Sequence, residues 1–166
     1  MGCDIHCLVE RWVQFEPDYG YWVNSGDPDI PRNYYIFSAL ADVRNSDAIP
    51  FIQRRRGVPE VCCELWYACR QNGMGWHDWG YVTLTEMKAY DLSRTFHCAA
   101  LVLARDEHGK PTATCRGSSQ PTLGPVGEIT IGDYMPSERW RQIIDYMERQ
   151  PHDSDDHVRL VFAFDN

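Results

Sequence analysis

Both ends of the chain have the pattern of a β-strand, and this constrains the fold more than any other feature. In residues 3–15 and again in residues 158–164, apolar side chains fall at alternate positions, which is the two-residue period of a strand with one buried face. Helical patterns lie between the two ends, and no segment has the length of a linker. We therefore predict one α+β domain over residues 1–166. Its mixed or mostly antiparallel sheet includes both terminal strands and is covered by three to four helices.

The interior of the chain supplies the helices and further strands. A turn after the first strand predicts a hairpin that returns over residues 21–23. A glycine-rich loop is expected at 73–80, an apolar strand over 96–103 with a continuation at 112–115, and a second loop at 117–127. Apolar stripes at helical spacing predict the helices. They cover about 33–43, about 59–69, 83–92 behind a Thr83–Glu86 capping box, and a last segment that starts near a Ser137 cap.

The composition excludes several classes of function. The chain has 24 acidic and 16 basic residues and a net charge of −8, so it lacks the positive face that general DNA or RNA binding requires. No window holds the roughly 18–20 apolar residues of a membrane span, and the first residues do not form a signal peptide. Seven cysteines without a C-x-x-C pair are typical of free thiols in a reducing compartment. The local run Arg54–Arg56 is either a solvated loop or a loop that faces an anion.

Asp4 and His6 are the first candidates for chemistry. Side chains two residues apart on a strand share a face, about 6.6 Å from each other. A carboxylate and an imidazole so placed are able to share a metal ion or to act as an oriented acid–base pair. The alternative is a partly exposed strand edge with ordinary polar residues.

The segment Trp76-His77-Asp78-Trp79 supplies the second group of candidates. His77 and Asp78 would complete a site begun by Asp4 and His6, with an open position suited to zinc or manganese hydrolysis chemistry. In that hypothesis Asp4, His6 and His77 are catalytic, and all four polar residues are metal ligands. Trp76 and Trp79 either stack on a ring of the ligand or anchor the loop.

Polar residues at both ends of the first predicted helix form the third group. Arginine side chains hold phosphate or carboxylate through two parallel hydrogen bonds, which makes this group a candidate anion site. Asn33 is equally suited to cap the helix. The group consists of Arg32, Asn33, Tyr34, Arg44 and Asn45. Asp165 and Asn166 end the last strand and are expected either beside the first strand or in a frayed terminus.

Four segments of the chain resemble a family of small bacteriophage and prophage proteins that begin Met-Gly-Cys-Asp-Ile-His and end Phe-Asp-Asn. They are Met1–His6, Arg32–Tyr34, Val43–Asn45 and Val158–Asn166. The resemblance spans both ends of the chain and implies a phage accessory protein that acts in the cytoplasm of the bacterial host. Proteins of this kind commonly counter host defence. Trp79 stands where the family has a second loop histidine, so one candidate metal ligand is absent.

Three hypotheses follow, and whether the protein is an enzyme stays open. In the first, it sequesters a small anionic, nucleotide-derived ligand, held by the arginines and stacked on Trp76, Trp79 or Tyr34; two copies of the chain could share such a site. In the second, it is a metal-dependent hydrolase or phosphodiesterase for such a ligand. In the third, it inhibits a host defence enzyme by direct protein–protein contact through its acidic surface.

Overall fold

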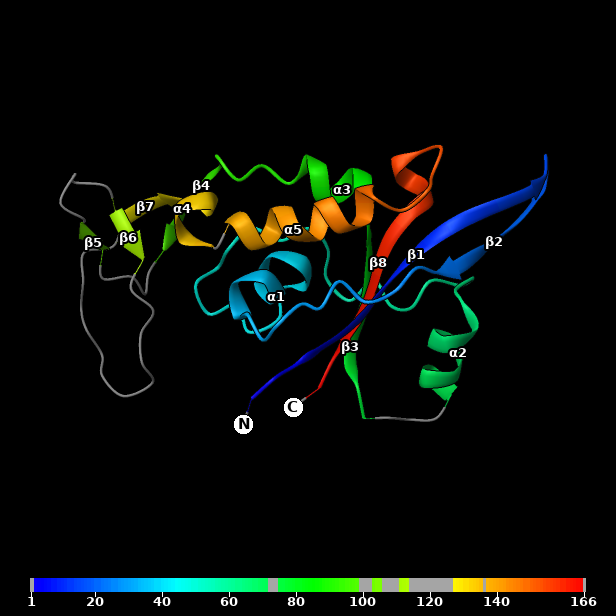
Figure 1. Ribbon diagram of the computed structural model, residues 1–166. Helices are drawn as coiled ribbons and strands as arrows, with labels where there is room; N and C mark the ends of the chain where they lie inside the picture. The colour runs from blue at the N-terminus through cyan, green and yellow to red at the C-terminus, as the bar shows by residue number, and fades with distance from the viewer. Residues whose placement is uncertain are drawn as a thin grey trace.

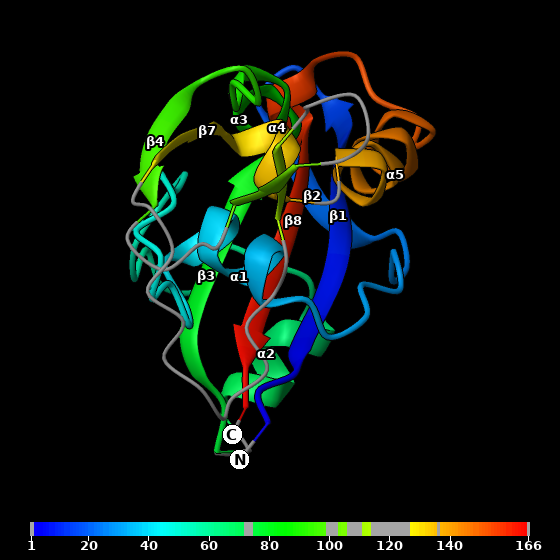
Figure 2. The ribbon, with the colours of Figure 1, turned by 90° about the vertical axis from the view of Figure 1, so that its left-hand side faces the viewer.

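The main sheet contains four antiparallel strands in the order β2-β1-β8-β3 (Figure 1). The computed structural model describes residues 2–71, 75–98, 103–105, 111–113, 127–135 and 137–165. The four strands are β1 (Ile5–Glu16), β2 (Tyr19–Asn24), β3 (His77–Thr83) and β8 (Val158–Phe164). The predicted α+β fold is confirmed, because both terminal strands pair with each other inside this sheet. The N- and C-termini consequently lie side by side in both views (Figures 1 and 2).

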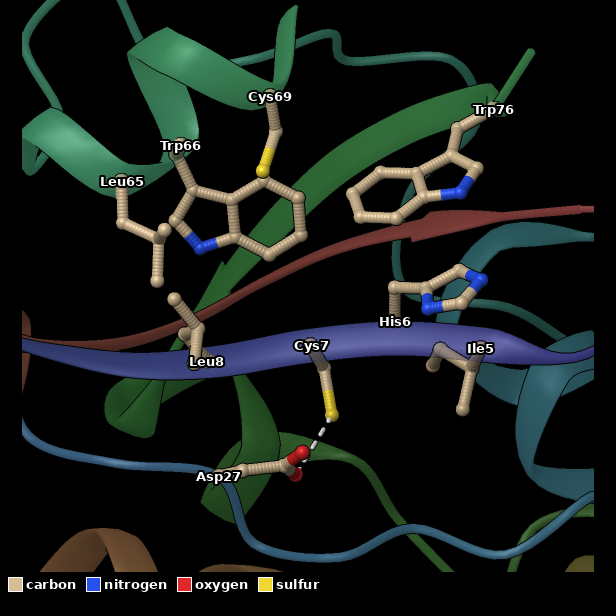
Figure 3. Close-up of a pocket in the computed structure, with 9 residues that line it drawn as sticks. All are labelled: Ile5, His6, Cys7, Leu8, Asp27, Leu65, Trp66, Cys69 and Trp76. Carbon is tan, nitrogen blue, oxygen red and sulfur yellow. Dashed lines mark hydrogen bonds between the residues drawn. The ribbon is translucent and has the colours of Figure 1, made fainter. Parts of the chain in front are cut away.

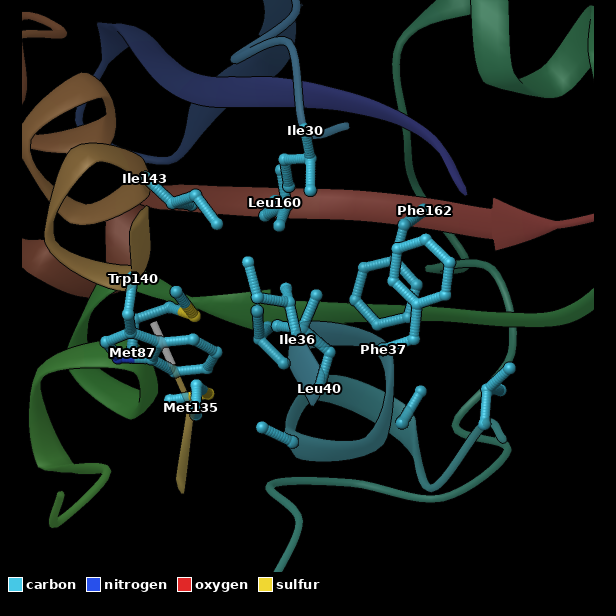
Figure 4. Close-up of a cluster of buried hydrophobic side chains, with 14 of the residues drawn as sticks. Ile30, Ile36, Phe37, Leu40, Met87, Met135, Trp140, Ile143, Leu160 and Phe162 are labelled. Carbon is cyan, nitrogen blue, oxygen red and sulfur yellow. The ribbon is translucent and has the colours of Figure 1, made fainter. Parts of the chain in front are cut away.

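The larger hydrophobic core lies on one face of the sheet, beneath the helices α1 (Tyr34–Ala41), α3 (Leu84–Ala89) and α5 (Ser137–Glu148) (Figure 4). Phe162 and Phe164 of β8 point into this core, where the ring of Phe37 lies 5.1 Å from that of Phe164. The predicted capping box is present at the start of α3. The apolar stripe that marks each helix in the sequence is therefore the side that packs on the sheet.

The smaller core lies on the opposite face, beneath α2 (Glu64–Gln71). Val161 and Ala163 of β8 point toward this side and pack with Trp66 of α2. All seven residues of β8 are buried, because successive side chains of a strand point to opposite faces and each face here is covered. This double burial explains why the closing strand has apolar residues at 161 and 163 as well as at the alternate positions.

A buried ion pair joins the sheet to the segment that leads into α2. Glu10 is fully buried and accepts a hydrogen bond of 2.8 Å from Nε of Arg159, which is 6% exposed. Its other carboxylate oxygen accepts from the backbone N–H of Cys63, and Arg159 donates to the carbonyl of Val61. The Arg159 guanidinium also lies 3.6 Å from the ring centroid of Trp22. The pair thereby holds the chain before α2 against the sheet.

Three boundaries differ from the sequence predictions. The Trp76–Trp79 segment is mostly strand, because β3 begins at His77 and pairs with β8; an irregular register between His77 and Gly80 accommodates Asp78 at a φ of 47°. Helix α2 begins at Glu64, five residues after Pro59, because the Glu10 and Arg159 side chains bind the preceding backbone. Helix α3 ends at Ala89 and not near residue 92.

The predicted strand at 96–103 lies partly outside the described residues, which hold a strand at its start and another that begins at residue 103. The remaining elements are β4 (Thr95–Cys98), β5 (Leu103–Arg105), β6 (Pro111–Ala113), β7 (Gly127–Thr130), α4 (Ile131–Tyr134) and the 3₁₀ turn η1 (Asp155–His157). β4 pairs with β7, and β5 pairs with β6. The predicted loop at 117–127 lies outside the described residues except for Gly127, as do residues 114 and 115 of the predicted strand continuation.

Candidate functional site

The two chain ends are joined by a network of polar contacts, here called the terminal clasp (Asp4, His6, Arg32 and Asp165). Arg32 donates two hydrogen bonds of 2.6 Å to the carboxylate of Asp4. The Asp4 N–H donates to Oδ1 of Asp165 at 3.0 Å, and the Asp165 N–H returns to the Asp4 carbonyl at 3.1 Å. The second Asp165 oxygen lies 2.9 Å from Nε2 of His6. The expectation that Asp165 lies beside the first strand is confirmed; Asn166 lies outside the described residues.

Electrostatics in the terminal clasp favour the charged carboxylates. The hydrogen bonds from Arg32 lower the pKa of Asp4 below its usual range, and the contact with His6 lowers the pKa of Asp165. The side chains of Asp4 and Arg32 are about half exposed, at 48% and 51%. Water therefore screens these pairs, and their main effect is to fix the geometry of the chain ends.

The predicted anion-binding residues around α1 make local structural contacts. Asn33 caps α1 by accepting from the N–H groups of Tyr35 and Ile36, which confirms the capping alternative. The Tyr34 hydroxyl accepts from the Cys3 N–H at 3.3 Å. Asn45 bonds the Asp42 side chain and the backbone of Ile49.

The arginines of the predicted anion site and of the 54–56 run also have partners in the protein. Arg44 lies beside the thiol of Cys3 and lowers its pKa, although burial raises that pKa more strongly. Each arginine of the run contacts a different carboxylate. These contacts are Arg54–Asp42 at 3.0 Å, Arg55–Asp78 at 3.4 Å and Arg56–Glu86 at 2.6 Å. The run therefore ties its loop to neighbouring segments.

The four predicted metal ligands fall into two separate pairs. His77 pairs with Phe164 in the sheet register, whereas His6 pairs with Ala163. Because Phe164 and Ala163 point to opposite faces, the two histidines do as well. Nδ1 of His77 lies 2.9 Å from Asp78, while His6 contacts Asp165. Within the described ranges no group of three or more histidine, cysteine or acidic side chains is placed to hold a metal ion.

Tryptophans gather around His6 on the α2 side of the sheet. The His6 ring stacks on Trp76, with ring centroids 4.2 Å apart and planes 10° from parallel. Trp76 in turn contacts Trp66 of α2 and Trp79 of β3, at centroid distances of 5.9 and 5.5 Å. Trp76 is thus the aromatic neighbour that fixes the His6 ring, and its partners anchor it to the smaller core.

The structure has a pocket between β1 and α2, here called the β1–α2 pocket, with a volume of about 200 Å³. Figure 3 shows His6 and Trp76 on one side of it, Trp66 and Cys69 above, and Asp27 below β1. Of the predicted site residues, His6 and Trp76 line the pocket; the others do not. The lining consists of Ile5, His6, Cys7, Leu8, Asp27, Leu65, Trp66, Cys69 and Trp76.

Sequence reasoning missed most of this lining. Leu65, Trp66 and Cys69 were recognised only as the apolar stripe of a helix, which is the pattern of any packed helix. The available signal was the high content of Phe, Trp and Tyr, which make up 13% of the chain, since aromatic-lined sites and dense cores share this feature.

The chemistry of the β1–α2 pocket is that of a small apolar recognition site. It offers aromatic and aliphatic surfaces, one imidazole and one carboxylate, and no arginine or lysine. Burial and the nearby Asp27 raise the pKa of the Cys7 thiol, so this sulfur stays protonated and is a poor nucleophile.

Comparisons with family models, curated proteins and solved structures produced no match. In the part of the chain that the structure describes, no helix has the length and apolar character needed to cross a membrane. The interpretation of the site therefore depends on its own geometry.

Proposed function

We propose that the protein acts by binding, and that the β1–α2 pocket receives an aromatic or aliphatic group of its target. The observation that carries this proposal is the lining, in which Trp66, Trp76, Leu65 and Leu8 surround a space of about 200 Å³. Binding pockets are commonly apolar with a few polar groups that fix orientation, and His6 and Asp27 would have that role here.

The volume of the pocket argues for a small group and not for a whole nucleotide. Sites for drug-sized ligands typically measure about 300–1,000 Å³, which is larger than this pocket. A phosphate would also lack a basic partner, because Arg32 and Arg44 do not line the pocket and Arg32 already binds Asp4. A nucleotide-derived ligand would therefore present its base, with its phosphates outside.

A binding role also agrees better with the side-chain contacts than hydrolysis does. The hydrolase hypothesis requires Asp4, His6, His77 and Asp78 around one metal ion, but the sheet register directs the two histidines to opposite faces. The resemblance to small phage proteins supports a role as an accessory protein in the host cytoplasm. Counter-defence by occupying a host protein is the form of that role which a small apolar pocket suits best.

Two probes test the proposed pocket. Indole is expected to shift the NMR signals of His6 and Trp76, while adenosine monophosphate should bind no more tightly than indole. A Leu65→Trp variant should block the pocket, because Leu65 lines its mouth and is itself 48% exposed. Val61→Trp is the matched control, since Val61 is exposed just before the same helix but does not line the pocket.

Each outcome has a defined meaning. Loss of indole binding in Leu65→Trp but not in Val61→Trp would support the pocket. Indole binding that is equal in both variants would contradict it. Tight binding of adenosine monophosphate with shifts at Arg32 and Arg44 would restore the anion site instead. The counter-defence role predicts that the wild-type protein, but not Leu65→Trp, restores phage infection of a defended host.

A further inference from the structure

We propose that the open edge of β1 beside the β1–α2 pocket binds an extended peptide segment of a partner protein. The segment would pair as an added strand with Ile5 and Cys7 and would place an apolar side chain in the pocket. This inference rests on the proposed function and names its partner class.

The backbone N–H and C=O groups of successive β1 residues point alternately toward β8 and toward the opposite side of the strand. The Asp165 N–H donates to the Asp4 carbonyl, so the backbone groups of Asp4, His6 and Leu8 face β8 in the antiparallel ladder. Those of Ile5, Cys7 and Val9 therefore face the other way. The contacts of Val9 agree, since its N–H donates to Gly26 and its carbonyl accepts from Ser25, at 2.8 and 2.7 Å.

Among the described residues, no strand pairs with the outward side of β1 over Ile5 and Cys7. Strand β2 pairs with β1 only from Glu10 onward. At the other end of the gap, the outward N–H of Cys3 donates to the Tyr34 hydroxyl. Between these closed ends, the N–H and C=O groups of Ile5 and Cys7 have no backbone partner among the residues that the structure describes. Unpaired strand edges of this kind are templates for strand addition.

The pocket runs along this edge. It touches the four consecutive residues Ile5–Leu8, whose side chains alternate between the two faces of the sheet. In Figure 3, His6 and Leu8 point toward α2, while Ile5 and Cys7 point toward the Asp27 side. A space in contact with both sets must reach around the strand edge, so a ligand in the pocket has access to the open backbone groups.

The walls of the pocket favour a single extended peptide as the partner, in preference to the edge strand of a folded sheet. Helix α2 rises on one side of β1, and the segment that carries Asp27 passes on the other (Figure 3). The open stretch lies between Cys3 and Val9, about 20 Å apart at about 3.3 Å per residue. A segment of roughly three to five residues is enough to pair with the two open positions.

The two walls of the pocket also favour different side chains at alternate positions of the bound peptide. The α2 wall, with Trp66, Trp76 and Leu65, selects an apolar or aromatic side chain. The opposite wall carries the exposed carboxylate of Asp27, and the exposed Asp29 follows two residues later in the same segment. A lysine or arginine next to the apolar residue would face these carboxylates, because successive residues of a strand point to opposite sides. The expected guest therefore alternates apolar and basic residues.

The test begins with selection of displayed random peptides of about seven residues against the whole protein. Peptides that alternate apolar and basic residues should be enriched. Binding should fall roughly five- to tenfold in Ile5→Pro relative to Ile5→Ala, because proline removes the outward N–H while both changes shorten the side chain. The β1–β8 ladder should survive in Ile5→Pro, since Ile5 does not donate to β8. Methylation of single peptide amides should weaken binding at every second position.

Amide hydrogen exchange keeps the test decisive if Ile5→Pro folds poorly. In the free wild-type protein, the amides of Ile5 and Cys7 should exchange faster than those of His6 and Leu8, and a selected peptide should slow them. Equal protection of all four amides in the free protein would overturn the proposal. So would a selection that enriches no peptide, or peptides that bind Ile5→Pro as well as Ile5→Ala.

The Leu65→Trp variant separates this proposal from the proposed pocket. Loss of peptide binding in Leu65→Trp but not in Ile5→Pro would keep the pocket and reject strand addition. Loss in Ile5→Pro but not in Leu65→Trp would keep strand addition and reject the pocket as the recognition element. Binding that neither variant affects would reject both.

Discussion

Replacing Arg159 with methionine is expected to destabilise the fold by about 3–5 kcal/mol, the usual cost of removing one member of a buried ion pair. Glu10 is fully buried and would lose the 2.8 Å bond from Arg159. The Val61 carbonyl would lose its donor, and Trp22 its cation. With a urea dependence of about 2 kcal/mol per M, the unfolding midpoint should fall by roughly 2 M.

A double variant isolates the effect of the unpaired charge. Glu10→Met with Arg159→Met removes both charges, so it should recover part of the lost stability relative to Arg159→Met alone. Recovery should be incomplete, because the Cys63 N–H and the Val61 carbonyl lose their partners. Urea unfolding of the wild type, both single variants and the double variant forms a complete cycle. A loss below about 1 kcal/mol for Arg159→Met, the level of a surface pair, would refute the claim that this pair is buried and structural.

Three further predictions concern α1, the terminal clasp and the main core. Asn33→Ala should cost about 1 kcal/mol through loss of the α1 cap, whereas Asn33→Ser should retain most of it; thermal unfolding of both variants measures this. The pKa of Asp165 is lowered in the folded state, so the contribution of Asp165 to stability is present above the unfolded pKa of about 3.9 and is lost as the pH falls through the folded pKa. The acid-unfolding curve of Asp165→Asn should therefore be shallower below about pH 4. An unchanged curve would contradict the contact with His6. Phe162→Ala should cost about 3–5 kcal/mol by opening a cavity at the centre of the sheet, and a loss below about 1 kcal/mol by urea unfolding would be inconsistent with that position.

The strands and helices with clear periodicity could be predicted from local sequence. Alternation in residues 3–15 and 158–164 predicted the terminal strands, and the Thr83–Glu86 pair predicted the start of α3. These signals are local, because side-chain spacing and end caps depend on neighbours within about one helical turn. The start of α2 was placed too early, since the contacts of Glu10 and Arg159 with the chain at residues 61–63 join segments far apart in sequence.

The candidate site was predicted only in part. His6 and Trp76 were identified and do lie together, and Asp4 joins His6 in the terminal clasp through Asp165. His77 lies on the other face of the sheet. Their grouping assumed that polar residues near strand ends converge. The register of β3 on β8 decides otherwise, because a shift of one residue exchanges the two faces of a sheet.

Sequence alone determined the fold class, the terminal strands, the capped start of α3 and the acidic charge, since composition and short-range spacing carry this information. Tertiary structure decided the partner of each arginine, the separation of His6 from His77, and the pocket between β1 and α2. It also decided where β2 stops pairing and leaves Ile5 and Cys7 open. The physical reason is that pairing register and charge neutralisation depend on which distant segments meet, and no local pattern in the chain encodes those meetings.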